Sequence, residues 1–286
     1  MSKKYSTSLV GIGALGSRFL SFFQNSKNFE LRQIISTKSY KEFQIPNQIK
    51  IASLIENLDL KIEVVFICLP DSLIFEALEK IEQLKSQNLT VLCFSGALVP
   101  KQKFSFNYGF LHPVNSFPQK SDSHSDLEEI YWNSMGDSKF TRIANLLTQE
   151  LRGKAFELKN EDLKPLYHSS CVIASNLLTS LLATAEESIS KALNEPTQSK
   201  LVLKNLVEQS VKNFFESENK NALSGPVKRK DFLTVEKNLT ALQNDFPEGI
   251  ETYKTLSKNL LRILDKNFTQ AEKAELLKIL GKSDFE

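Results

Sequence analysis

Three histidines are the side chains of this 286-residue chain best suited to moving protons near neutral pH. His112 precedes Pro113 in the run LHPVNSFP, which favours an extended backbone. His168 opens a segment that carries no charge from residue 169 to residue 185. His124 lies in the polar sequence QKSDSHSD, where we expect it to be solvated, and we assign it no role. His168 is therefore the first candidate proton donor and His112 the second; the alternative for each is a structural histidine.

The uncharged segment predicts a helix with one polar stripe. At 100° per residue, His168, Cys171 and Ser175 lie on one stripe, with Asn176 at its edge. We name Asn176 as a third candidate catalytic residue and Cys171 and Ser175 as candidate substrate contacts. A core helix whose polar groups satisfy one another is the alternative. Arg229, in the basic turn SGPVKRK, is suited to bidentate binding of a substrate carboxylate or phosphate, unless that turn is simply solvated.

A glycine motif stands at the start of the chain. Gly11, Gly13 and Gly16 match GxGxxG, with an apolar strand before them and an amphipathic helix after them. Gly11 would allow the tight turn, Gly13 the approach of a pyrophosphate, and Gly16 the packing of helix on strand. Ala14 and Leu15 fall where the first free N–H groups of the helix would bind phosphate. The motif predicts a dinucleotide site; a glycine-rich turn without a ligand is the alternative.

The end of the second predicted strand bears on the choice of cofactor. In NAD-binding folds an acidic residue about 20 residues after the glycines binds the ribose hydroxyls. This sequence instead has Ser36, Thr37 and Lys38 there, and hydroxyls with a lysine suit a 2′-phosphate. We therefore expect NADP(H) rather than NAD(H). The missing acid also argues against an S-adenosylmethionine methyltransferase.

Two later strand ends complete the expected cofactor site. Leu69 and Pro70 follow the run EVVFIC, and Asp71 or Ser72 is placed to cap the next helix. Ser95 and Gly96 end the run LTVLCF, where nicotinamide and substrate would meet. A plain loop is the alternative at that position.

These motifs need a parallel sheet to position them. Apolar runs at 8–13, 30–35, 63–70 and 89–96 alternate with helical patterns at 14–24 and 72–85, which indicates an open α/β sheet. Beyond about residue 160 only helical patterns remain. The predicted fold class is α/β: a Rossmann-type, mostly parallel sheet in an N-terminal domain, residues 1–159, followed by an all-α C-terminal domain, residues 160–286.

Composition excludes several function classes. Lys+Arg of 36 against Asp+Glu of 34 leaves a net charge of +2, which gives no reason to expect a nucleic-acid partner. Cys68, Cys93 and Cys171 lack metal-ligand spacing, so we predict no metal site and reduced, buried thiols in a cytoplasmic protein. The uncharged 169–185 segment is shorter than the roughly 20 residues of a membrane helix, so we expect a buried core helix and no membrane partner.

Together these residues resemble a family that joins a Rossmann-like NADP-binding domain to a helical C-terminal domain of unknown function. Its members are often labelled NADP oxidoreductases, by similarity to pyrroline-carboxylate reductases and deazaflavin-dependent NADP oxidoreductases. The resemblance covers most of the chain and rests on GIGALG, LPDS, SGAL, LHPVNSFP, YHSSCVIASN and LSGPVKRKD. The sequence departs from the family at Cys93 and Asn238, where histidines are common, and at Lys230, where glycine is usual.

The resemblance implies an NADP(H)-dependent oxidoreductase that transfers hydride to or from a small carbonyl or imine compound, which Arg229 would allow to be anionic. It also implies a helical domain that forms a homodimer, and a cleft between the domains lined by these motifs. A non-catalytic NADP-binding module, acting in sensing or in partner binding, is the alternative, and the missing histidines favour it.

Overall fold

The structure is a computed structural model that describes residues 3–37, 43, 45–85 and 88–281. The chain forms two compact units, Met1–Ile173 and Ala174–Glu286. The change from strands to helices, which set the predicted domain border at residue 160, precedes the border between these units. Each unit is described by itself below.

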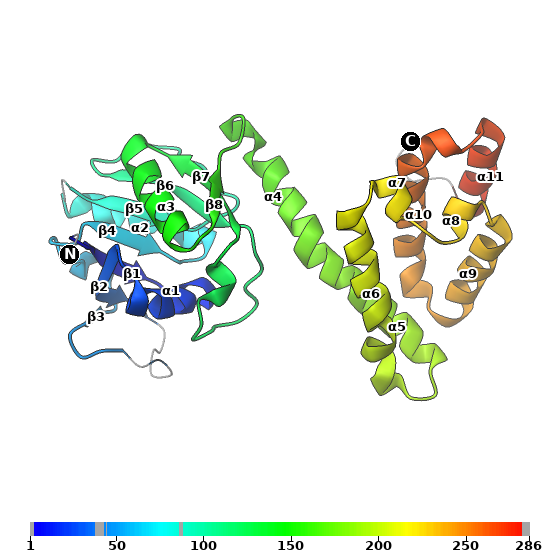
Figure 1. The fold of residues 1–286 in the computed structure, drawn as a ribbon, viewed down its shortest axis with the longest axis horizontal. Helices are drawn as coiled ribbons and strands as arrows, with labels where there is room; N and C mark the ends of the chain where they lie inside the picture. The colour runs from blue at the N-terminus through cyan, green and yellow to red at the C-terminus, as the bar shows by residue number, and fades with distance from the viewer. Residues whose placement is uncertain (1–2, 38–42, 44, 86–87, 282–286) are drawn as a thin grey trace. The chain divides into compact units, whose positions relative to one another are not determined.

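An eight-stranded sheet forms the centre of the first unit, in the order β3-β2-β1-β4-β5-β6-β7-β8 (Figure 1). The strands are β1 Tyr5–Val10, β2 Phe29–Ile35, β3 Lys50–Ala52, β4 Val64–Ile67, β5 Thr90–Cys93, β6 Asn107–Pro113, β7 Tyr131–Gly136 and β8 Lys154–Phe156. The first six are parallel, β7 runs antiparallel to β6, and β8 is parallel to β7. The order reverses between β1 and β4, where sheets of this kind bind dinucleotides.

Three helices, α1 Ala14–Asn25, α2 Asp71–Gln83 and α3 Ser138–Glu150, pack against the sheet. Successive side chains of β1 enter different cores: Leu9 joins α1 and α3, and Val10 joins α2. This alternation follows from the two-residue repeat of a strand, and it covers both faces of the sheet. All residues of β4 and β5 are buried, which explains their uninterrupted apolar sequences. The predicted fold class is confirmed.

Local signals fixed most element boundaries, with one exception. The Asp231 side chain accepts a hydrogen bond from the Thr234 N–H, Thr269 and Glu272 form a capping box, and Gly281 ends the last helix with φ of +75°. The cap predicted from Asp71 or Ser72 is wrong. Pro70 is the cap residue of α2, so the chain enters the helix at Asp71 without a side-chain cap.

The second unit is helical. It contains α5 Leu178–Ala192, α6 Ser199–Glu216, α7 Asn219–Ala222, α8 Pro226–Arg229, α9 Phe232–Asp245, α10 Ile250–Ile263 and α11 Gln270–Leu280. A small apolar core joins α8 to the last three helices through Val227, Val235, Leu261 and Leu276. Lys230 ends α8 in the left-handed region, with φ of 59°. That conformation explains why glycine is usual at this position in the family that the sequence resembles.

The opening stretch of the helical half differs from the prediction. Helix α4, Lys164–Val172, is followed directly by a π-helical turn, Ile173–Leu177, before α5 begins. The whole helix, Glu161–Ala192, is long and apolar enough to cross a membrane by length and composition, and its most apolar 18-residue window has a mean hydropathy of 1.2. None of its most apolar window is buried. The expectation of a buried core helix is therefore wrong for this window, which stays uncovered among the described residues.

Candidate active site

The glycine turn connects β1 to α1 and is shaped by steric limits. Gly11 has φ of +91°, and a Cβ built on it would lie 2.6 Å from the carbonyl oxygen of Cys68. A Cβ on Gly16 would lie 2.0 Å from the carbonyl oxygen of Gly11. Gly13 differs: nothing lies within 4 Å of a Cβ built there, and it begins α1 without a side-chain cap. Two glycines are therefore required by the fold, while the third leaves open space at a free helix N-terminus.

That open space fits a pyrophosphate. The first N–H groups of α1, at Ala14 and Leu15, have no helical acceptor, and the helix dipole favours an anion there. Ala14 and Leu15 are half-buried and begin the helix, as predicted.

A hollow of about 200 Å³ lies at the carboxyl ends of β1 and β2. Ser36, Thr37 and Leu69, three of the residues predicted to bind a cofactor, line it, and Pro70 follows at the start of α2. Lys38 lies outside the described residues.

The same hollow contains charges that the sequence pattern did not indicate. Glu56 and Glu76 line it together with Lys80, whose Nζ lies 2.9 Å from Glu76 and 3.6 Å from Glu56. These carboxylates come from the chain after β3 and from α2. Lys80 offsets part of their charge, which bears on the choice between NAD(H) and NADP(H).

Two imidazoles converge beside Gly96, just past the end of β5. A Cβ built on Gly96 would lie 2.6 Å from His168 Nδ1 and 2.8 Å from His112 Nε2. The rings are perpendicular, with centroids 6.1 Å apart. Within the described residues, His168 Nδ1 is buried without a hydrogen-bond partner. Ser95 is buried and its hydroxyl accepts hydrogen bonds from the N–H groups of Ala97 and Leu98, which holds the turn.

Three further residues support His112. The antiparallel register places Asn133 of β7 directly opposite His112 of β6. Asn133 Oδ1 accepts a 2.6 Å hydrogen bond from Nζ of Lys164, a fully buried lysine. The Tyr167 hydroxyl lies 2.6 Å from His112 Nδ1. Contacts therefore connect four residues in sequence: His112, Asn133, Lys164 and Tyr167.

Helix periodicity explains how α4 supplies so many of these groups. Lys164, Tyr167, His168 and Cys171 are spaced i, i+3, i+4 and i+7, which places them on one face. The predicted stripe contained His168 and Cys171 but stopped short of Lys164 and Tyr167. In the sequence, a lysine at the start of an apolar helix is typical of a solvated helix end. Only the contact with buried Asn133 shows that Lys164 is itself buried.

The environment keeps His112 neutral. Burial, the Lys164 cation and His168 together lower the pKa of His112 to about 4. Burial also lowers the pKa of Lys164 to about 8, against the opposing influence of Cys171 and Asp71. Burial raises the pKa of the Tyr167 hydroxyl, so it stays protonated at neutral pH.

His124, to which we assigned no role, has a structural one. Its Nδ1 lies 3.0 Å from Ser21 Oγ on α1, and its Nε2 lies 3.5 Å from a Glu128 oxygen. The expectation of a solvated ring is wrong, because these partners hold the loop before β7 against α1. Arg18 holds the same loop through a 2.7 Å ion pair with Asp126.

The remaining predicted site residues lie in or next to the helical unit. Ser175 and Asn176 fall within the π-helical turn, and Ser175 Oγ donates a 2.8 Å hydrogen bond to Asn176 Oδ1. Turns of this kind are rare and occur often at functional sites. The turn interrupts the 3.6-residue period, so the predicted stripe holds only as far as Cys171. Arg229 is exposed on α8 in the second unit.

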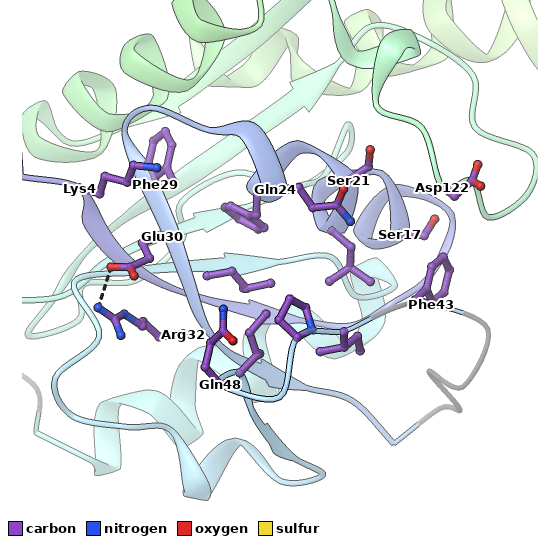
Figure 2. Close-up of a pocket in the computed structure, with 16 residues that line it drawn as sticks. Lys4, Ser17, Ser21, Gln24, Phe29, Glu30, Arg32, Phe43, Gln48 and Asp122 are labelled. Atoms are coloured by element: carbon purple, nitrogen blue, oxygen red, sulfur yellow. Dashed lines mark ion pairs between the residues drawn. The ribbon is translucent and has the colours of Figure 1, made fainter.

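A second hollow, of about 640 Å³, lies along α1 and β2 (Figure 2). Its floor is apolar, and polar side chains such as Gln24, Gln48 and Asp122 surround it; Glu30 and Arg32 form an ion pair of 2.8 Å. It contains none of the predicted site residues. Among the described residues no three His, Cys, Asp or Glu side chains group as metal ligands, and none of the three cysteines forms a disulfide. Cys93 is buried as predicted, whereas the prediction of burial is wrong for Cys68 and Cys171, which are half-buried.

Comparison with known proteins agrees with this arrangement. Residues 130–260 match the family model of a domain of unknown function, DUF2520. No curated protein matches the sequence. A protein of Bacteroides fragilis assigned as an NADP oxidoreductase has a similar structure, with a TM-score of 0.69 and 19% identity over 90% of this chain and 98% of its own.

Two further solved structures are similar. A Thermotoga maritima protein gives a TM-score of 0.67 at 22% identity, covering 91% of this chain and 99% of its own. The pyrroline carboxylate reductase of Plasmodium falciparum, solved with NADP bound, gives 0.57 at 13% identity, covering 95% and 98%. The resemblance drawn from the sequence motifs is confirmed at the level of fold and of the helical domain's family model.

Proposed function

We propose that this protein is an NADP(H)-dependent oxidoreductase that transfers hydride to or from a small carbonyl or imine compound. The convergence of His112 Nε2 and His168 Nδ1 beside Gly96 carries the proposal. It lies at the carboxyl edge of the same sheet whose β1 leads into the glycine turn. Similar structures include an imine reductase with NAD⁺ and a reductive aminase with NADPH. Three cysteines without a disulfide among the described residues fit a cytoplasmic location.

The bound dinucleotide would supply or accept the hydride. The turn at Gly13 and the N–H groups of Ala14 and Leu15 would hold its pyrophosphate. His168 Nδ1, buried without a hydrogen-bond partner among the described residues, would give a proton to the reduced oxygen or nitrogen, or take one in the reverse direction. Neutral His112 is placed to hold the same atom by a hydrogen bond. Asn176 remains a proposed catalytic residue. Cys171, Ser175 and Arg229 remain proposed substrate contacts, with Arg229 suited to an anionic group.

Cofactor preference gives the first test. We expect NADPH to raise the melting temperature by several degrees and NADH to raise it less, because Ser36 and Thr37 offer hydroxyls without a nearby acid on β2. A ligand at 100 times its Kd stabilises a protein by about 2.7 kcal/mol. Thermal-shift titration with NADPH, NADH and S-adenosylmethionine measures this directly.

A matched variant sharpens the comparison. Thr37→Asp places a carboxylate where a ribose hydroxyl would bind and a 2′-phosphate would be repelled, so it should reverse the preference toward NADH. Ser53→Asp is the matched control, because Ser53 is another residue that lines the same hollow. Thr7→Asp would not serve as a control, because Thr7 is buried. Equal stabilisation of the wild type by both cofactors would refute the NADP(H) preference. No stabilisation by either would refute the proposed function.

The substrate class is tested by following NADPH oxidation with small keto acids, aldehydes and cyclic imines. Turnover of one class supports the proposal. NADPH binding without oxidation across the panel would instead support the non-catalytic module.

We also propose that a second copy of this chain covers the exposed apolar side chains of α6, which lie on more than one side of that helix. Leu201, Leu206 and Phe215 on α6 are 72%, 65% and 79% exposed. Charged side chains are interspersed along the same helix. The partners of the Lys204–Glu208 ion pair and of the Lys212–Glu216 ion pair are each one helical turn apart. A surface that mixes apolar and charged side chains suits a protein partner better than lipid, and exposed apolar patches mark interaction surfaces.

Self-association is measured by sedimentation equilibrium. We expect the wild type to be a dimer and Leu206→Glu to shift it toward monomer. Leu233→Glu is the control, since Leu233 is similarly exposed, at 62%, but lies on α9. A monomeric wild type, or equal effects of the two substitutions, would contradict this assignment.

A further inference from the structure

We propose that Tyr167 is a positioning residue that fixes the tautomer of His112, so that the ring proton lies on Nε2 and is directed at the space beside Gly96. The inference rests on the proposed function for its purpose, but its geometry stands independently. The two histidines then have separate roles: His112 donates a hydrogen bond, and His168 transfers the proton.

The first step is the short contact between Tyr167 and His112. A neutral imidazole has one N–H donor and one bare nitrogen acceptor, and the partner of one nitrogen decides the state of the other. Tyr167 Oη lies 2.6 Å from His112 Nδ1. A phenol O–H is a stronger donor than an imidazole N–H, so Tyr167 donates and Nδ1 accepts. The proton of His112 is then on Nε2.

The second step concerns competing partners of the Tyr167 hydroxyl. Cys171, one turn along α4, also lies within hydrogen-bonding reach of it. A thiol sulfur is a weak acceptor, so it does not displace the imidazole nitrogen. Burial and Cys171 both raise the pKa of the Tyr167 hydroxyl, so it keeps its proton and can donate it to His112.

The third step is that neighbouring groups hold this arrangement in place. Lys164 lies 5.3 Å from the Tyr167 ring centroid as a cation over its face, and the bond from Lys164 to Asn133 fixes the lysine to β7. The charged or titratable groups around His112 are Lys164, Tyr167 and His168 from α4, with Cys171 behind Tyr167 and Asp71 of α2 acting on Lys164. β7 offers uncharged Asn133 opposite, and the turn after β5 offers Gly96.

The consequence lies at Nε2. That nitrogen and His168 Nδ1 both approach the point where Gly96 lacks a side chain. An N–H aimed at this point stabilises negative charge that develops on a reacting oxygen or nitrogen. His112 is held neutral by burial and by Lys164, so proton transfer falls to His168.

Nitrogen NMR of the full chain, labelled with ¹⁵N-histidine, tests the inference. Only three histidines are present, so His124→Gln and His168→Gln assign the signals of all three. Protonated and bare ring nitrogens resonate far apart, which identifies the tautomer without cofactor or substrate. We expect His112 to have a bare Nδ1 and a protonated Nε2, and not to titrate from pH 8 down to about pH 5.

Tyr167→Phe removes the hydroxyl and keeps the ring. The His112 nitrogens should then shift toward the averaged values of two exchanging tautomers, and kcat should fall about tenfold to a hundredfold with little change in KM. Tyr131→Phe, at an exposed tyrosine of β7, should leave the His112 signals unchanged.

A wild-type His112 protonated on Nδ1 would overturn the inference, as would a Tyr167→Phe spectrum identical to the wild type. If the variant does not fold, the wild-type spectrum alone decides. The tautomer is measured on the free protein, so a chain that binds no dinucleotide would refute the proposed function and leave this result in force.

Discussion

His168→Ala is expected to lower kcat about a hundredfold to ten-thousandfold, the usual range for loss of a general acid or base. The reason is geometric: His168 Nδ1 is one of two ring nitrogens that meet beside Gly96, and it is buried with no partner among the described residues to share its proton. NADPH affinity should change by no more than about twofold, because the glycine turn lies on other elements. Steady-state kinetics and thermal-shift titration measure the two quantities separately.

His124→Ala is the matched control for this experiment. His124 is also a half-buried histidine, but it contacts Ser21 and Glu128. We expect a lower melting temperature and nearly normal turnover. Full activity of His168→Ala would remove His168 from the mechanism and leave His112 as the remaining candidate.

Gly13→Ala is expected to weaken NADPH binding at least about a hundredfold while the free protein remains folded. A methyl group on residue 13 would keep the pyrophosphate away from the N–H groups of Ala14 and Leu15. Hydrogen bonds to a charged group contribute about 1.5–3 kcal/mol each, so losing these two lowers the affinity by this factor. Gly13 has φ of −90°, and nothing lies within 4 Å of a Cβ placed there, so the free chain tolerates alanine. Loss of the glycine as helix cap should cost at most about 1 kcal/mol of stability.

Gly16→Ala provides the contrast. Its Cβ would lie 2.0 Å from the Gly11 carbonyl oxygen, so that substitution should lower stability and binding together. Isothermal titration with NADPH and thermal denaturation of each free variant separate the two cases. Undiminished NADPH binding by Gly13→Ala would show that the open space at Gly13 does not hold the cofactor.

The sequence predicted the cofactor half of the fold well because its signals are local. The motif GIGALG occupies six consecutive residues around one turn. The apolar runs of β4 and β5 indicate strands that are buried on both faces of the sheet. His168 and Cys171 were placed on one face because a helix has a fixed period. These predictions needed no knowledge of distant contacts.

The remaining parts of the site depend on contacts between distant segments. Asn133 meets His112 only through the antiparallel register of β6 and β7, and Lys164 is buried only because α4 places it against Asn133. Glu56 and Glu76 reach the hollow beside Ser36 from two other segments. The π-helical turn has no composition of its own that would reveal it in the sequence. Propensity and spacing do not carry this information.

The register that joins β6 to β7 also limits how the gene can change. Side chains of a strand alternate between the faces of a sheet, so inserting or deleting one codon inside β7 would turn Asn133 away from Lys164. A substitution at one of these residues leaves the strand register intact, whereas inserting or deleting one residue in β6 or β7 breaks the alignment of His112 with Asn133. Descent from a common ancestor could therefore vary the length of the loop between these strands far more freely than the length of the strands themselves.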